Sequence, residues 1–207
     1  MGTERRMGMK MSFFDETEYV GDCFEKIEFL KGEVRSKEFV ECCFVECDFS
    51  ETIFRGCRFK ECSFQKCNLS LIKVVDSLFA GVVFEDCKLI GVDWTQASLP
   101  AVLLSAPLAF LRCDISLSVF LGMVLKEMVM DDCRAHDVDF READLSKGRL
   151  MRTDFAKSLF FETDLSETDL SHAKNYAIDI YQNRITKAKF SLPEAMSLLE
   201  SMDIELT

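Results

Sequence analysis

Residues 42–69 read CCFVECDFSETIFRGCRFKECSFQKCNL, and this stretch decides the fold. A large apolar residue recurs at every fifth position from Phe44 to Leu69, and a small residue stands two positions before most of them. A five-residue period matches neither the turn of an α-helix, about 3.6 residues, nor the alternation of a β-strand, about 2 residues. It indicates a chain that turns a corner once per repeat and keeps the same two side chains inside.

The apolar column continues outward from this stretch in both directions, with one change of phase. Before the change it consists of Phe24, Phe29, Val34, Phe39, Phe44, Phe49, Phe54, Phe59, Phe64, Leu69, Val74, Phe79, Phe84, Leu89, Trp94, Leu99 and Leu104. After it come Phe110, Ile115, Phe120, Leu125, Met130, Ala135, Phe140, Leu145, Leu150, Phe155, Phe160, Leu165 and Leu170. The phase shifts by one residue near Pro107. Because proline cannot donate a backbone hydrogen bond, we expect a kink or a bulge there.

A second column, two positions before each centre, holds small side chains and eight of the ten cysteines. Its members are Cys42, Cys47, Thr52, Cys57, Cys62, Cys67, Ser77, Val82, Cys87, Val92, Ala97, Cys113, Ser118, Cys133, Val138, Ala143, Gly148, Thr153, Ser158, Thr163 and Thr168. Free cysteine packs as a small hydrophobe. The C-x4-C repeat of Cys57, Cys62 and Cys67 could also indicate a metal site, but successive units point from different faces and zinc-knuckle spacing is absent. We therefore expect no metal.

Disulfides are a further alternative for the cysteines. Cys47, Cys67 and Cys87 are expected to stack about 5 Å apart, which lies within bridging distance. A reducing cytosol would keep such thiols free, so we interpret them as buried packing thiols. Cys23 and Cys43 lie outside the interior column, and we expect them to be exposed thiols.

The units 143–146 (ADLS) and 163–166 (TDLS) show the repeat in its clearest form. The chain resembles the pentapeptide-repeat family, whose consensus is A-(D/N)-L-x-x, from about Asp22 to Ala177. The resemblance implies an all-β fold, a right-handed quadrilateral β-helix of about eight coils spaced about 4.8 Å apart. The expected domains are a flexible N-terminal tail (1–18), the β-helix (19–177) and a C-terminal capping and dimerisation segment with a short helix (178–207).

With four units to a coil, every fourth centre should stack on one face. One face is expected to form a ladder of Phe39, Phe59, Phe79, Leu99, Phe120, Phe140 and Phe160. Another face, centred on Phe24 and its equivalents, is expected to carry an excess of acidic over basic side chains and to bind a partner. Its acidic residues are Asp22, Glu25, Glu46, Glu85, Asp86, Glu127, Asp144, Asp164 and Glu167.

The formal net charge of −11 bears on the kind of partner. An acidic surface repels nucleic acid, so we expect no direct DNA binding. It suits a basic partner, including the DNA-binding surface of another protein. Two alternatives stay open: the charge only keeps the protein soluble, or the acids are scattered by chance.

The sequence contains no nucleotide-binding, zinc-protease or serine-hydrolase motif. The acidic pairs Glu85-Asp86 and Asp131-Asp132 occupy solvent-facing positions, and His136 and His172 have no nucleophile at a motif spacing. We therefore expect no enzymatic activity and no cofactor. No apolar run is long enough to span a membrane, and the N-terminus lacks the apolar segment of a secretory signal, so we expect a cytoplasmic protein.

The C-terminal segment is predicted to cover the open end of the β-helix, to form a dimer interface, or both. Ser191 and Glu194 have the spacing of a helix capping box, followed by apolar residues at helical spacing. The candidate dimer interface consists of Tyr176, Ile180, Phe190, Leu192, Met196 and Leu199.

Residues 175–181 (NYAIDIY), 189–195 (KFSLPEA) and 85–98 (EDCKLIGVDWTQAS) resemble the AlbG-type albicidin-resistance members of the family. The chain is more distantly similar to Qnr-type quinolone-resistance proteins. This resemblance implies a homodimer joined through its C-termini. It also implies binding to DNA gyrase, and to topoisomerase IV, in place of DNA, with protection from gyrase poisons. The alternative is a pentapeptide-repeat scaffold that binds a different protein partner.

Overall fold

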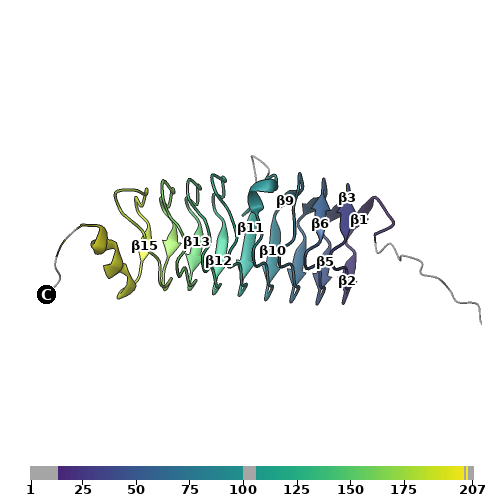
Figure 1. Ribbon diagram of the computed structural model, residues 1–207, viewed down its shortest axis with the longest axis horizontal. Coiled ribbons are helices and arrows are strands. Elements are labelled where there is room, and N and C mark those ends of the chain that lie inside the picture. The colour runs from purple at the N-terminus through teal and green to yellow at the C-terminus, as the bar shows by residue number, and fades with distance from the viewer. Residues whose placement is uncertain (1–13, 100–105, 203, 205–207) are drawn as a thin grey trace, which may run out of the picture.

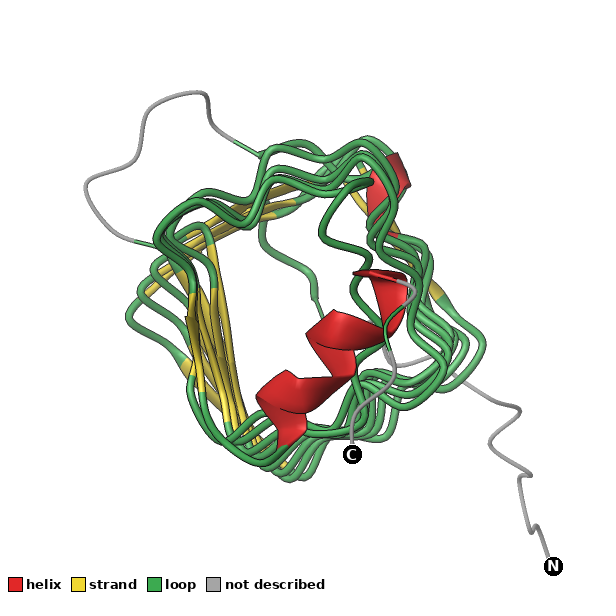
Figure 2. Ribbon diagram, turned by 90° about the vertical axis from the view of Figure 1, so that its left-hand side faces the viewer, coloured by secondary structure: helices red, strands yellow, loops and turns green. Residues whose placement is uncertain are grey.

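A computed structural model describes residues 14–99, 106–202 and 204. The chain winds into a rod of stacked coils, about eight turns long (Figure 1). Seen along the rod, each coil has a four-sided outline, and a short helix lies across the C-terminal end (Figure 2). The predicted β-helix of about eight coils is thereby confirmed.

Every strand pair is parallel, because each coil runs in the same direction as the one before it. The longest sheet contains β2 (Cys23–Glu25), β5 (Cys43–Val45), β8 (Ser63–Gln65), β10 (Val82–Glu85), β11 (Leu108–Leu111), β12 (Val129–Asp131), β13 (Arg149–Met151), β14 (Asp169–Leu170) and β15 (Lys189–Phe190). A second sheet contains β1 (Glu18–Val20), β4 (Glu38–Val40), β7 (Arg58–Lys60) and β9 (Leu78–Ala80). A third pairs β3 (Glu33–Arg35) with β6 (Ile53–Arg55). We name three sides the β2–β15, β1–β9 and β3–β6 faces; the fourth is joined by isolated bridges such as Asp48 to Asn68.

The corners of the coils lie two positions after each apolar centre. Lys26, Glu46 and Lys66 all have φ near +55° there, in the left-handed region that turns the chain sharply. The consensus Asp of the repeat supports this turn, since the Asp164 Oδ1 atom accepts the backbone N–H of Ser166 at 2.9 Å. These aspartates are therefore required by the fold before they serve any function.

Both apolar columns point inward. The rings of Phe44 and Phe64 stack with centroids 4.5 Å apart and planes 8° from parallel. In the second column, the Cys62 Sγ atom donates to the carbonyl of Phe39 at 3.3 Å in the coil before it. The Thr163 hydroxyl makes the equivalent bond to the carbonyl of Phe140 at 2.9 Å. Small side chains with a hydrogen-bond donor, weak in Cys and strong in Thr, are thus favoured because they reach a backbone carbonyl of the preceding coil.

The predicted one-residue shift near Pro107 is wrong in size. Phe84 of β10 pairs with Phe110 of β11, across a coil that is 26 residues long where its neighbours have 20. Leu104, one of the expected centres, lies outside the described residues. The long coil contains six more residues than its neighbours. Each later unit therefore lies one face away from the face to which the expected one-residue shift assigns it.

The expected phenylalanine ladder is accordingly divided at the long coil. Phe39, Phe59 and Phe79 do stack on the β1–β9 face. Phe120 stacks instead on Trp94, with ring centroids 6.0 Å apart and planes 7° from parallel, and so continues the β3–β6 face. Phe140 and Phe160 follow Phe120 on that face.

Both ends of the rod are covered by apolar side chains. At the N-terminal end Phe14 is 5% exposed and packs edge-on against Phe24 and Phe39, so this residue of the expected tail belongs to the core. Residues 1–13 lie outside the described residues. At the other end β15 extends the sheet beyond Ala177, and the 3-10 helix η2 (Glu194–Met202) follows it. A second 3-10 turn, η1, spans Trp94–Gln96.

The capping box predicted at Ser191 does not form. The Ser191 hydroxyl accepts the backbone N–H of His172 at 3.1 Å, while the backbone carbonyl of Ser191 accepts the N–H of Ala195 at 3.0 Å. Ser191 therefore ties the C-terminal segment to the last coil.

Candidate functional site

The acidic residues predicted to share one face are divided between two. Asp22, Glu25, Glu46, Glu85 and Asp86 lie on or beside strands β2, β5 and β10 of the β2–β15 face, as expected. The remaining four do not continue this stripe, because the long coil displaces them. They are Glu127, Asp144, Asp164 and Glu167, which lie on the continuation of the β1–β9 face, where Val124, Asp144, Asp164 and Arg184 form a ladder. The single negative stripe is thus a wrong prediction.

Basic side chains neutralise several of these acids. Arg112 forms ion pairs with Glu85 and with Asp86, the latter at 2.8 Å, and thereby bridges the coils on either side of the break. The hydrogen bond from Arg112 holds the pKa of Asp86 below its usual range. Lys26 lies 3.8 Å from Glu46. The β2–β15 face therefore carries alternating charges along its length.

The displaced acids are similarly engaged. Lys126 lies 3.4 Å from Asp144, and Arg184 lies 3.4 Å from Asp164. Burial opposes ionisation of Asp164, but hydrogen bonds from Ser166 outweigh it and lower the pKa of Asp164. These two aspartates are turn residues of the repeat as well as surface charges, so their contribution to a binding face is secondary to their role in the coil.

The residues of the candidate dimer interface fall into two groups. Tyr176 is buried and packs against Phe190 with ring centroids 5.6 Å apart, so these two close the end of the core. Ile180 and Leu199 are partly exposed. Leu192 is 79% exposed and Met196 is 48% exposed. An apolar surface therefore remains on the C-terminal end, and it extends to Tyr181, Met202 and Ile204, which are also exposed.

The cysteines separate into a buried set and one bonded pair. The eight cysteines of the interior column are free and buried. Burial raises the pKa of the Cys62 thiol to about 12, so it stays protonated and unreactive near neutral pH. Cys23 and Cys43 lie side by side on β2 and β5, with Cα atoms 4.6 Å apart, and are joined by a disulfide. The prediction that these two are free thiols is therefore wrong.

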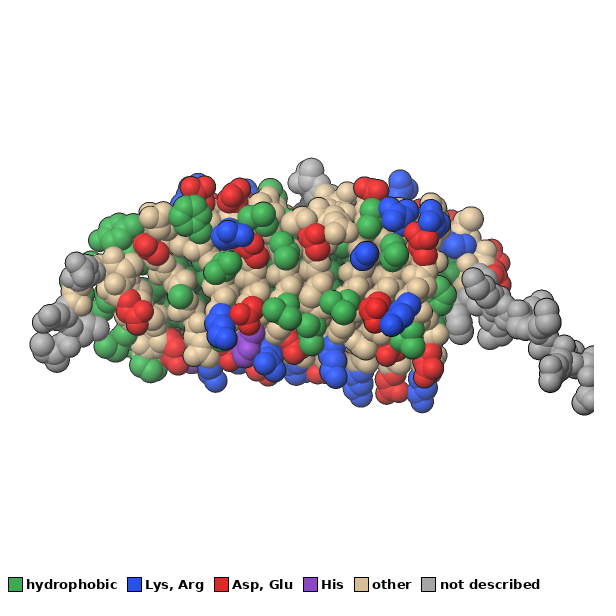
Figure 3. Space-filling view, in the orientation of Figure 1, with side chains coloured by type: hydrophobic (Ala, Val, Ile, Leu, Met, Phe, Trp, Pro, Cys, Tyr) green, Lys and Arg blue, Asp and Glu red, His purple; other side chains and the backbone are tan. Residues whose placement is uncertain are grey.

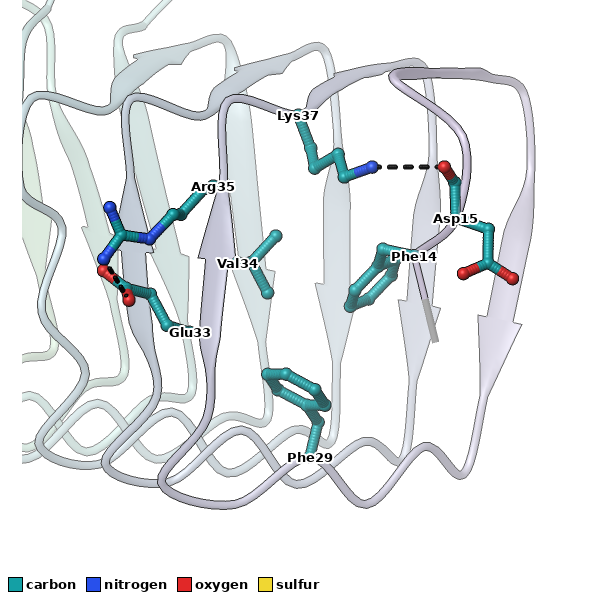
Figure 4. A pocket seen from close by; sticks show the side chains of 7 residues that line it. All are labelled: Phe14, Asp15, Phe29, Glu33, Val34, Arg35 and Lys37. Carbon is teal, nitrogen blue, oxygen red and sulfur yellow. Dashed lines mark hydrogen bonds and ion pairs between the residues drawn. The ribbon is translucent and has the colours of Figure 1, made fainter. Parts of the chain in front are cut away.

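A pocket of about 320 Å³ opens at the N-terminal end of the rod (Figure 4). Its lining consists of Phe14, Asp15, Phe29, Glu33, Val34, Arg35 and Lys37. Glu33 is bound by Arg35 at 2.6 Å and by Arg55 at 3.1 Å, and these two guanidinium groups lower its pKa. Lys37 donates to the backbone carbonyl of Asp15 at 3.4 Å. The basic groups of the pocket are thus already engaged within the chain.

His136 is the histidine with the most contacts to polar side chains. Its Nδ1 atom accepts from Arg134 Nε at 3.2 Å, and its Nε2 atom lies 3.1 Å from Asp154 Oδ2. The nearby Ser116 hydroxyl accepts the backbone N–H of His136 and donates to Asp114, so it does not meet the ring. Within the described residues no group of three His, Cys, Asp or Glu side chains converges as a metal site would require.

An apolar surface on the continuation of the β3–β6 face was missed by the sequence analysis. Leu121, Leu159 and Phe161 are 39%, 49% and 44% exposed, and Val124 beside them is 65% exposed. Hydrophobic side chains are visible among charged ones over the C-terminal half of the rod (Figure 3). The signal was present in the sequence, since the outward positions on either side of Phe120 and Phe160 are apolar where other units carry polar residues.

With this geometry in place, the chain can be compared with known proteins. A family model for a pentapeptide repeat region matches residues 37–106, and a second model, for eight copies of pentapeptide repeats, matches residues 139–174. The chain is a pentapeptide-repeat protein. The first match ends within the long coil, which runs from Phe84 to Phe110 and breaks the five-residue period.

Solved structures of QnrB1, a plasmid-mediated fluoroquinolone resistance protein, share this pentapeptide-repeat fold. One trypsin-treated form has a TM-score of 0.61 at 20% identity, covering 92% of this chain and 98% of that one. Another has a TM-score of 0.65 at 18% identity, covering 89% and 100%. Full-length QnrB1 has a TM-score of 0.57 at 18% identity, covering 88% and 100%. At these identities the likeness establishes the fold.

No curated protein matches the pentapeptide-repeat chain. Among its described residues, no helix has the length and apolar character needed to cross a membrane.

Proposed function

We propose that this pentapeptide-repeat protein binds DNA gyrase, and topoisomerase IV, at the surface that otherwise holds DNA, and so protects the enzyme from inhibitors of the albicidin or quinolone type. The observation that carries the proposal is the fold match with QnrB1, a fluoroquinolone resistance protein, over 92% of this chain and 98% of that one. The rod shape and the net charge of −11 are consistent with it. The protein would act in the cytoplasm, by binding alone and without catalysis.

The corrected register changes how such mimicry would work. With Asp22, Glu25 and Glu46 on one face and Glu127 and Glu167 on another, the acidic side chains lie on two faces of the rod instead of forming one stripe. A DNA duplex carries charge around its whole axis, about one per 1.7 Å. The rod would thus present carboxylates to a basic groove from more than one side, which favours association by long-range attraction.

The exposed apolar residues at the C-terminal end support a homodimer. Leu192 and Met196 project from the segment that closes the rod, and Tyr181 is 70% exposed beside it. Pairing two such ends would cover these side chains and double the length of the acidic rod. Replacing both Leu192 and Met196 with serine is expected to convert a dimer to a monomer in analytical ultracentrifugation, whereas an unchanged mass would contradict this interface.

A scaffold that binds a different protein partner is the second candidate function. The apolar side chains of Leu121, Leu159 and Phe161 favour it, because such a surface does not resemble the polyanionic exterior of DNA.

A supercoiling assay with purified gyrase distinguishes the two functions. The protein alone is expected to inhibit supercoiling at high concentration, and at lower concentration to restore supercoiling in the presence of albicidin or a fluoroquinolone. If micromolar protein causes no inhibition and no rescue, the topoisomerase function is ruled out and the scaffold function remains.

A further inference from the structure

The C-terminal half of the β3–β6 face carries an apolar surface that the core does not use. Val119, Asp139 and Leu159 form one outward ladder through successive coils. Two positions further along each coil are Leu121, Arg141 and Phe161. We call the exposed apolar members of these coils the apolar surface. They are Leu117, Leu121, Leu159 and Phe161, with Val124 on the adjoining continuation of the β1–β9 face; Val119 beside them is partly buried.

The polar residues within the apolar surface neutralise each other. Arg141 donates from Nε to Asp139 Oδ1 at 2.9 Å and from a terminal nitrogen to Asp139 Oδ2 at 2.7 Å, which is a two-point ion pair within one unit. The pair lowers the pKa of Asp139. Its charges cancel between Leu121 and Phe161, so the centre of the surface has no net charge available to a ligand.

The rim of the apolar surface is mainly acidic. Asp137, Glu142 and Glu162 are exposed at the corners of the same coils, and Lys157 occupies the corner one coil after Asp137. None of the three acids has a basic side chain within 4.0 Å among the residues that the structure describes. The N-terminal half of the same face is different, since Arg35 and Arg55 there both bind Glu33. Unpaired carboxylates around an apolar centre distinguish the C-terminal half.

We propose that this apolar surface binds a basic amphipathic helix from another protein. Apolar side chains of such a helix would cover Leu121 and Phe161, and its Lys or Arg residues would pair with Glu142 and Glu162, which form the acidic edge of the surface. From Leu117 to Phe161 the surface spans two coil spacings, roughly 10 Å. A helix of about 7 residues has that length, and about 14 residues would extend over the rim on both sides.

The charge of the rim favours this occupant over the others. A second copy of the chain would bring its own acids against the same acids, at a net charge of −11 for each copy. Nucleic acid and anionic lipid head groups would be repelled in the same way. The binding proposed at this surface does not depend on the topoisomerase function proposed above.

The test uses the full chain and three fluorescent peptides of about 14 residues. One has leucine and lysine at helical spacing, one replaces its leucines with serine, and one replaces its lysines with glutamate. Fluorescence anisotropy at physiological ionic strength should show the leucine–lysine peptide binding at least tenfold more tightly than either of the others. Equal binding of the serine–lysine peptide would show that charge alone is responsible and would overturn the proposal.

Matched variants locate the binding site. Leu121→Ser with Phe161→Ser removes two exposed apolar side chains and is expected to lower the affinity for the leucine–lysine peptide at least tenfold. Val20→Ser with Leu71→Ser removes two side chains of comparable exposure, 61% and 54%, elsewhere on the rod and should change the affinity less than twofold. Equal weakening by both pairs, or by neither, would overturn the proposal.

Circular dichroism and thermal melting establish that both double variants fold before binding is measured. Sedimentation of each variant tests the remaining occupant. If Leu121→Ser with Phe161→Ser lowers the mass of the assembly while the control pair does not, the surface binds a second copy and the proposal is wrong. The experiment contains no topoisomerase, so its failure and that of the proposed function are separate results.

Discussion

The two halves of the β-helix, before and after the long coil, have the same backbone and different interiors. Before it the centres are mostly phenylalanine and the small column is mostly cysteine; after it leucine is as frequent as phenylalanine among the centres, and Thr, Ser or Ala prevail in the small column. Phe64 stacks between two other rings, whereas Leu150 has aliphatic neighbours in its sheet. The comparison teaches that the coil requires small side chains in the second column, many but not all of which carry a donor, and tolerates large changes in chemistry.

The largest expected difference between the halves concerns the aromatic stack. Phe64→Ala removes a ring that lies 4.5 Å from Phe44 and 5.0 Å from Phe84, and is expected to cost about 3–5 kcal/mol in the free energy of unfolding. Leu150→Ala in the later half is expected to cost about 2–4 kcal/mol. Urea unfolding followed by circular dichroism measures both, and a smaller cost for Phe64→Ala would contradict the role given to ring stacking.

Alkaline pH should destabilise the cysteine-rich half first. Burial raises the pKa of Cys62 from 9.0 to about 12, and also raises the pKa of Cys42 and Cys57. The stability that comes from keeping these thiols protonated is complete below pH 9, where the unfolded chain is protonated as well. It is lost progressively as pH rises from 9 towards 12.

Hydrogen exchange between pH 8 and 11 should therefore show opening in residues 38–90 before residues 130–170. Cys62→Ser, which keeps a donor of similar size without the thiol, should move that opening to higher pH. Simultaneous opening of both halves, unaffected by the substitution, would contradict the linkage to cysteine ionisation.

Substitutions in the small column are expected to lower stability less, and here the later half should lose more stability than the cysteine-rich half. Thr163→Val leaves the carbonyl of Phe140 without its 2.9 Å hydroxyl donor and is expected to cost about 1–2 kcal/mol. Cys62→Val removes only a weak sulfur donor at 3.3 Å and should cost less than about 1 kcal/mol. Equal costs in chemical denaturation would show that the column is selected for volume alone.

The smallest expected effect concerns the ion pairs across the long coil. Arg112→Gln removes the partner of Glu85 and Asp86, but all three side chains are substantially exposed. Exposed pairs contribute little to stability, so the melting temperature should change hardly at all. The pKa of Asp86 should rise towards its ordinary value, which NMR titration measures. A large loss of stability would show that the pair holds the two halves together.

The regular part of this fold was predictable because the five-residue period is a local property of the sequence. The centres around Phe44 to Leu69 and the small column needed only spacing and size to be recognised. The register across residues 84–110 was not predictable, because an insertion of one residue and an insertion of six residues leave the same phase in a five-residue repeat. Only strand pairing, Phe84 with Phe110, distinguishes them.

The candidate site depended on that distinction. An error of one unit moved Asp144 and Asp164 to the wrong face and created an acidic stripe that the molecule lacks. It also concealed the apolar surface, since Leu121 and Phe161 gather on one face only in the correct register. The disulfide between Cys23 and Cys43 was not predicted for a different reason. A reducing cytosol argued against disulfides in general, and the stacking distance was considered only for the cysteines of the interior column.

The most direct test of the proposed function is competition with DNA for gyrase. A fluorescent DNA duplex bound to gyrase should be displaced by this protein in fluorescence anisotropy, at a concentration that rises as salt is added, because both ligands would use the same basic groove. The account predicts that the protein displaces all of the bound duplex and that the displacement curve fits a single affinity of the protein for gyrase. A complex in which gyrase holds the protein and the full complement of DNA together would contradict it.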